Sequence, residues 1–111
     1  MQSPTLSALA LTLIAIGPLM SASSAQAEGL DGADLFVKKT CVACHGKDAK
    51  TPILPVYPKL AGQSADYAFN QMNDIKSGAR NNGQTAAMKG VMHLVNEEEM
   101  RAIANWLSTL Q

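Results

Sequence analysis

Residues 41–45 read Cys-Val-Ala-Cys-His, and the chain contains no other cysteine. Three kinds of chemistry use cysteines at this spacing. A dithiol redox pair belongs beside a βαβ pattern, and the sequence shows no β-rich stretch. A structural zinc site usually draws on a second Cys or His pair at similar spacing, and the only histidine outside the motif, His93, has no such neighbour. The remaining chemistry is covalent haem attachment, which uses the pattern C-x-x-C-H.

The order of residues within the motif suits that chemistry. On one helical turn Cys41 and Cys44 lie on the same side, and His45 follows closely enough to reach a metal that the two thiols flank. The sequence therefore predicts one covalently bound haem c. Cys41 and Cys44 are expected to form the thioether bonds, and His45 is expected to ligate the iron.

The N-terminus carries the features of an export signal. Leu6–Met20 is an apolar stretch, and Ala25-Gln26-Ala27 is an A-x-A cleavage site. The competing interpretation is an uncleaved anchor, because residues 1–5 contain no Lys or Arg. Against it, the apolar stretch is shorter than the roughly 20 residues that span a bilayer, and Gly17-Pro18 interrupts it. We expect cleavage after Ala27 and a periplasmic location.

Residues 28–111 would then form one small domain whose apolar core is marginal without help. Aromatic residues make up only 5% of the chain, and a haem that engages both cysteines leaves none for a disulfide. A bound haem would supply a large apolar body for side chains to pack around. Nine basic and nine acidic residues give zero net charge, which does not favour nucleic acid as a partner. Membrane contact is expected only through a membrane-bound redox partner or an uncleaved signal.

Two helices are predicted on either side of a proline-rich loop. The first runs from the N-cap candidate Asp31 into the haem motif, over about residues 31–45. The second covers about residues 64–76, with Ser64 as N-cap candidate and Gly78 just past its end. Three prolines between residues 51 and 63 exclude regular helix or central strand there.

A third helix is predicted at the C-terminus. Asn96 is its N-cap candidate, and Glu99 stands three positions later, which is a capping-box arrangement. Trp106 lies beside the apolar face of this helix. The apolar residues that recur at helical spacing are Met100, Ile103, Ala104, Leu107 and Leu110.

With these features together, the chain resembles the class I c-type cytochromes. The likeness is to the small monohaem bacterial branch, whose fold also forms each half of certain dihaem cytochromes. The resemblance implies an all-α fold of three main helices and loops wrapped around one covalently attached haem. The motifs that carry it are Gly32-x-x-x-Phe36, Cys41-Val-Ala-Cys44-His45, Pro58-Lys-Leu60-Ala-Gly62-Gln63, Lys76-Ser-Gly78-x-Arg80, Met88 and Trp106-Leu107.

The resemblance also implies roles for individual residues. The carbonyl of Pro58 would accept a hydrogen bond from the ring nitrogen of His45 that does not bind iron, and Leu60 would pack on the haem. Gly32, Phe36 and Trp106 would meet where the first and last helices cross; as ordinary core contacts their role is structural.

The residue in the sixth iron position is less strongly marked. Met72 and Met100 lie on apolar helix stripes, where methionine usually fills the core. Met88 lies in a stretch that reads as a loop, and the resemblance favours it over Met92 as the second axial ligand. His93 would give a bis-histidine haem, and its other interpretation is a residue at the surface or the haem edge.

Ligation by His45 and Met88 would raise the reduction potential and close the iron to substrates. This predicts a carrier of single electrons between a donor and an acceptor protein, not an enzyme. One alternative is the cytochrome subunit of a flavoprotein dehydrogenase of the flavocytochrome c type, docked through an apolar patch. The candidates for this patch are Ile53, Leu54 and Tyr57, whose other interpretation is that they cover the haem. Another is a five-coordinate haem sensor or peroxidase. Lysines that steer acidic partners, or merely solvate the surface, are Lys38, Lys39, Lys47, Lys50, Lys59 and Lys89.

Overall fold

The computed structural model describes residues 3–5, 10, 12–18 and 29–111. The predicted cleavage site at Ala25–Ala27 lies outside the described residues, as does part of the apolar stretch before it. Within the described part no helix has both the length and the apolar character that a membrane span requires. The helices are α1 (Gly32–Lys38), α2 (Val42–His45), α3 (Ala65–Ser77), α4 (Thr85–Met92) and α5 (Glu97–Thr109), and the same residues contain no strand.

The all-α prediction is confirmed, and the three predicted N-caps are present. The side chain of Asp31 accepts hydrogen bonds from two backbone amides of α1, and that of Ser64 accepts one from Tyr67 in α3. Asn96 and Glu99 form the complete capping box of α5. Each cap satisfies amides that a helix start would otherwise leave without an acceptor.

The predicted first helix is divided in two. Residues 31–45 were expected to form one helix, but α1 ends at Lys38 and α2 begins at Val42. Between them Thr40 has a positive φ of 66°, a left-handed conformation that interrupts a right-handed helix. The break lets α2 leave the axis of α1, so that the haem motif has its own orientation.

The stretch around Met88 is a helix, and the expectation of a loop there is wrong. α4 covers Thr85–Met92. Its sequence contains the good helix formers Ala, Met and Lys. Its interior glycine, Gly90, is exposed, and a Cβ added there would have no neighbour within 4 Å, so the lack of a side chain costs no packing at this position.

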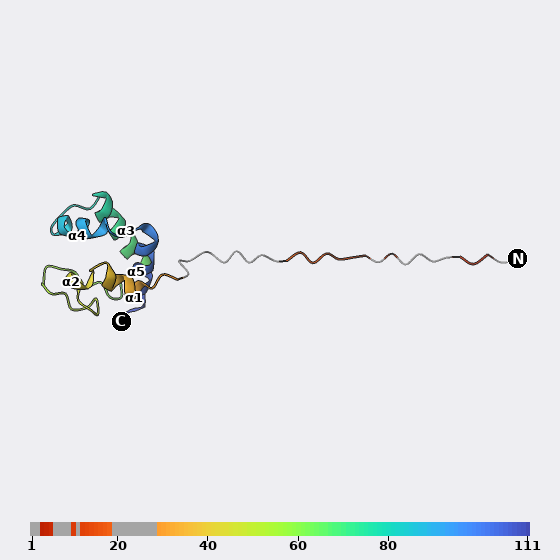
Figure 1. Ribbon diagram of the computed structural model, residues 1–111, viewed down its shortest axis with the longest axis horizontal. Helices are drawn as coiled ribbons and strands as arrows, with labels where there is room; N and C mark the ends of the chain where they lie inside the picture. Colours follow the sequence, from red (N-terminus) through yellow and green to blue (C-terminus); the bar gives the residue numbers. More distant parts are fainter. Residues whose placement is uncertain (1–2, 6–9, 11, 19–28) are drawn as a thin grey trace.

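The helices lie in two groups that α5 joins. α5 packs against both α1 and α3, and α4 packs against α3. In Figure 1 α1 and α2 occupy the lower part of the view and α3 and α4 the upper part. The largest fully buried side chains come from both groups and from α5: Phe36, Ile75, Val95, Met100 and Ile103.

The crossing of α1 and α5 is close because Gly32 has no side chain. A Cβ at Gly32 would lie 2.3 Å from the carbonyl oxygen of Ala102 and 2.6 Å from the Cβ of Trp106. One turn further along α1, the rings of Phe36 and Trp106 pack with centroids 5.1 Å apart. The predicted meeting of Gly32, Phe36 and Trp106 is therefore present in the structure.

Replacing Gly32 by alanine should destabilise the protein by about 1–3 kcal/mol, because the helices must separate to admit the methyl group. Thermal and denaturant unfolding of the holoprotein would measure the change. Gly90→Ala in α4 is the matched control, and we expect it to be neutral or stabilising by up to about 1 kcal/mol. Equal stability of Gly32→Ala and the native protein would contradict the close crossing.

Candidate functional site

His45 is the last residue of α2 and one of the most deeply buried polar residues, with 6% of its surface exposed. Its Nδ1 lies 2.9 Å from the carbonyl oxygen of Pro58, which is the contact that the resemblance implied. Because a carbonyl oxygen only accepts, Nδ1 carries the proton, and the lone pair of the ring is on Nε2. The contact therefore leaves Nε2 as the nitrogen that is able to bind a metal.

The electrostatics of His45 favour the same state. Burial lowers the pKa of His45 below its ordinary value, although the hydrogen bond to Pro58 acts in the opposite direction. A lowered pKa keeps the imidazole neutral at neutral pH, and only a neutral imidazole has a lone pair to give to a metal.

The two cysteines flank the short helix that ends in His45. Cys41 is the N-cap residue of α2 and Cys44 lies within it; both side chains are half-buried and neither is in a disulfide. Burial raises the pKa of the Cys41 thiol to about 11. At neutral pH this thiol is therefore protonated, unlike the activated thiolate of a dithiol redox enzyme.

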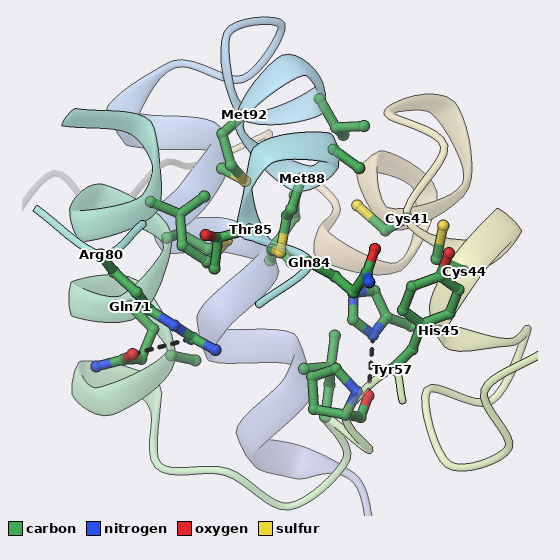
Figure 2. A pocket seen from close by; sticks show the side chains of 18 of the residues that line it. Cys41, Cys44, His45, Tyr57, Gln71, Arg80, Gln84, Thr85, Met88 and Met92 are labelled. Carbon is green, nitrogen blue, oxygen red and sulfur yellow. Dashed lines mark hydrogen bonds between the residues drawn. The ribbon is translucent and has the colours of Figure 1, made fainter. Parts of the chain in front are cut away.

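A cavity of about 540 Å³ separates the two groups of helices. Its volume falls in the range of cofactor pockets. Cys41, Cys44 and His45 line it from one side, and residues of α3, α4 and α5 line it from the others. Figure 2 shows His45 and Met88 entering this space from different elements.

The predicted pocket residues Pro58 and Leu60 both line the cavity. Met88 and Met92 also line it, one turn apart on α4. Met88 is partly buried, whereas Met92 is only 2% exposed and belongs to the hydrophobic core. In the view of Figure 2 Met88 lies nearer to His45 than Met92 does.

The other candidates for an iron ligand have different positions. His93 is exposed and is not among the residues that line the cavity. Met100 is buried in the core away from the cavity lining, and Met72 is buried but also lines the cavity. Met72 and Met100 lie on the apolar faces of α3 and α5, as expected for methionines that fill the core.

Two polar residues of the wall were not among the predicted site residues. Nη1 of Arg80 donates to Oε1 of Gln71 at 3.0 Å, and both residues line the cavity. Figure 2 shows this pair on the side of the cavity formed by α3. Two features of the sequence could have indicated this pair: Gln71 stands beside the apolar face of α3, and an arginine follows shortly after Gly78.

These features together fit a haem. The cavity is large and mostly apolar, as the porphyrin requires, and Arg80 in its wall would supply a positive charge for propionate groups. Cys41 and Cys44 supply two thiols on the wall, and His45 supplies a neutral imidazole whose tautomer is already fixed. The fold and the site therefore define an all-α protein that binds haem through C-x-x-C-H.

Comparison with known proteins identifies the family. The family model of cytochrome c matches residues 30–111. The chain is 33% identical over 94 residues to a thiosulfate dehydrogenase electron acceptor of Stutzerimonas stutzeri, which is 78% of this chain and 42% of that protein. It is 37% identical over 70 residues to cytochrome c-554(548) of Halomonas halodenitrificans, covering 63% of this chain and 83% of the relative. Cytochrome c-553 of Nitratidesulfovibrio vulgaris is 30% identical over 100 residues, 90% of this chain and 96% of the relative.

The chain belongs to the cytochrome c family, and its relatives agree with the class I type. It is an electron-transfer protein that carries covalently bound haem c. The matched segment spans less than half of the first relative, at 42% of its length.

Substituting the cysteines should weaken and then abolish covalent attachment. We expect Cys41→Ala and Cys44→Ala each to leave one thioether and to lower the yield of folded holoprotein, because the core depends on the haem. The double variant should release all haem on denaturation. Intact mass spectrometry under denaturing conditions measures the bound fraction, with Ala43→Ser, at an exposed position between the thiols, as the control. Covalent haem in the double variant would refute the assignment.

Proposed function

We propose that this chain is exported and acts as a periplasmic carrier of single electrons, with His45 and Met88 as the two axial iron ligands. When bound, the haem supplies a centre that takes up and releases one electron. The observation that carries the proposal is the arrangement of the two side chains. His45, with its Nδ1 committed to Pro58, and Met88 of α4 enter one cavity from different helices.

Burial supports Met88 over its neighbour. Met92 is 2% exposed and packs in the hydrophobic core, so its thioether already has an apolar role. Met88 packs against that core but is only partly buried, and it borders the cavity. A sulfur ligand favours ferrous iron and so raises the reduction potential, which suits a protein that receives electrons from a dehydrogenase.

Ligation of the iron by two protein side chains also favours an electron carrier over an enzyme. If His45 and Met88 both bound the iron, they would leave it no free position for peroxide, oxygen or another small substrate. The residues of the chain then have three tasks. They hold the cofactor, exclude water from it, and keep the iron coordination the same in both oxidation states.

Export is supported by the N-terminal sequence and by the chemistry. The family match begins at residue 30, just after the predicted cleavage site at Ala27, and bacterial haem c is attached outside the cytoplasm. The intact mass of the purified protein tests this: residues 28–111 plus one haem are expected. A mass that includes Leu6–Met20 would instead indicate a retained anchor.

The surface near the haem motif suits a protein partner. The proline-rich loop exposes three apolar side chains, Ile53, Leu54 and Val56, at 63%, 47% and 60%. Lys47 and Lys50 follow the motif directly in the sequence, are exposed, and take part in none of the salt bridges among the described residues. We infer docking of a redox protein whose contact surface is apolar with an acidic rim.

Two kinds of donor fit this surface. Relatives named as thiosulfate dehydrogenase electron acceptors, in Stutzerimonas stutzeri and Thiomonas intermedia, favour a periplasmic dehydrogenase that the carrier meets transiently. The exposed apolar loop equally suits a stable complex with a flavoprotein dehydrogenase subunit. Co-purification of a flavin-containing chain would distinguish the stable complex from the transient encounter.

Removing the sulfur of Met88 should lower the reduction potential and open the iron. We expect Met88→Leu to lower the potential by on the order of 0.1 V and to bind carbon monoxide in the reduced state at neutral pH. Redox titration and the carbon monoxide difference spectrum measure both effects. Met92→Leu is the control, because it removes a sulfur one turn away while nearly conserving volume. A larger drop in Met92→Leu would transfer the ligand role to Met92.

Neutralising the exposed lysines should change electron transfer according to the charge of the oxidant. We expect Lys47→Gln/Lys50→Gln to slow oxidation by ferricyanide roughly two- to fivefold at low salt and to speed oxidation by a cationic cobalt complex. Stopped-flow absorption measures both rates. Asn105→Asp/Gln111→Glu changes the net charge equally at exposed positions outside the cavity lining. Equal slowing by the two double variants would show that net charge, and not this surface, steers the encounter.

A further inference from the structure

Two lysines from different helices hold the short turn that joins α4 to α5. Nζ of Lys39, the C-cap residue of α1, donates to the carbonyl oxygen of Leu94 at 2.9 Å. Nζ of Lys76, in the last turn of α3, donates to the carbonyl oxygen of Val95. Two successive carbonyl groups of the turn are therefore bound by charged donors, which form stronger hydrogen bonds than neutral ones.

The ammonium group of Lys39 is also tied to the start of α5. It lies 3.1 Å from Oε2 of Glu99, in a pair whose side chains are only 25% and 17% exposed. The same carboxylate oxygen accepts the backbone amide of Asn96 at 3.1 Å. Burial acts to raise the pKa of Glu99, but the amide of Asn96 and the charge of Lys39 outweigh it and lower the pKa. The carboxylate is thus ionised at neutral pH and holds the lysine.

The position of α4 depends on this turn as well as on the packing of α4 against α3 and the core. Its main helix partner is α3, whereas α5 packs against both α1 and α3. The C-terminal end of α4 runs directly into the turn, where the amide of Val95 donates to the carbonyl of Met92. A displacement of the turn would therefore move the helix that carries Met88.

We propose that Lys39 and Lys76 are positioning residues for Met88: by binding the turn after α4, they keep the thioether in the cavity and close the iron to outside ligands. The proposal rests on the proposed function, in which Met88 ligates the iron. Neither lysine is among the residues that line the cavity, so both act through the backbone of the turn.

The proposal predicts how an added ligand competes with Met88. A ligand that binds only when the thioether has left has an apparent affinity reduced by the small fraction of open molecules. Loss of one charged hydrogen bond to the turn should raise that fraction about tenfold. Imidazole binding to the oxidised holoprotein measures it, together with loss of the weak far-red sulfur-to-iron band.

The variants are Lys39→Leu and Lys76→Leu, which remove the donor and keep much of the apolar stem. We expect each to bind imidazole about tenfold more tightly than the native protein. Lys38→Leu is the matched control, because Lys38 is a neighbouring exposed lysine of α1 whose only salt bridge in the described residues is with Asp34. Equal tightening in Lys38→Leu would overturn the proposal.

Combining the lysine substitutions with Met88→Leu distinguishes a specific effect on Met88 from a general loosening of the protein. In the Met88→Leu background the lysine substitutions should change imidazole affinity less than twofold, because no thioether remains to be displaced. Tenfold effects in that background too would overturn the proposal. If Met88→Leu alone leaves imidazole affinity at the native value, the ligand assignment itself fails. If Met88→Leu opens the iron and the lysine variants do not, only the positioning role fails.

Conservative variants and hydrogen exchange complete the test without relying on ligand binding alone. Lys39→Arg and Lys76→Arg keep a charged donor, and we expect affinities within a few-fold of the native value. Amide exchange of α4 should quicken in the leucine variants and stay near native in the arginine variants. Arginine variants that behave like the leucine variants would show that the hydrogen bonds to the turn are not what holds Met88.

Discussion

The hydrogen bond from His45 to the carbonyl of Pro58 connects the haem motif to the rest of the fold. It fixes the ring tautomer, and it joins α2 to the proline-rich loop, whose following residues bind elsewhere. The amides of Leu60 and Ala61 both donate to the carbonyl of the fully buried Ala49. The loop lacks regular structure because of its prolines, yet these contacts hold it as one wall of the cavity. The proposed iron ligand His45 and the wall that supports it thereby come from a single segment, residues 45–61.

The helices alone do not form a complete core. Leu60 and Met88 pack against the core but are only partly buried, and both border the cavity. The haem would therefore complete the apolar interior, as the low aromatic content of the chain requires. Folding and cofactor attachment are thus expected to be coupled, and the same side chains that stabilise the fold keep water from the iron.

Local signals in the sequence were sufficient to predict the helix caps, the apolar helix faces and the haem motif. Each of these features depends on residues that are close together in the sequence. The break at Thr40 could not be read in the same way, since a left-handed threonine has no composition signal. α4 was missed because two glycines and two asparagines around residues 81–90 resemble a loop. The pairing of Arg80 with Gln71 depends on how the chain turns at Gly78, which only the assembled fold defines.

The close crossing at Gly32 brings the first helix of the domain against the last, α5. Contacts between such distant segments cost more chain entropy than local contacts, because the loop that they close is long. Because α5 is the last helix to be synthesised, this crossing and the packing of Phe36 on Trp106 cannot form until residues 97–109 have been made. Until then α5 does not yet close the cavity that Cys41 and Cys44 line, because Ile103 and Leu107 of α5 form part of its wall.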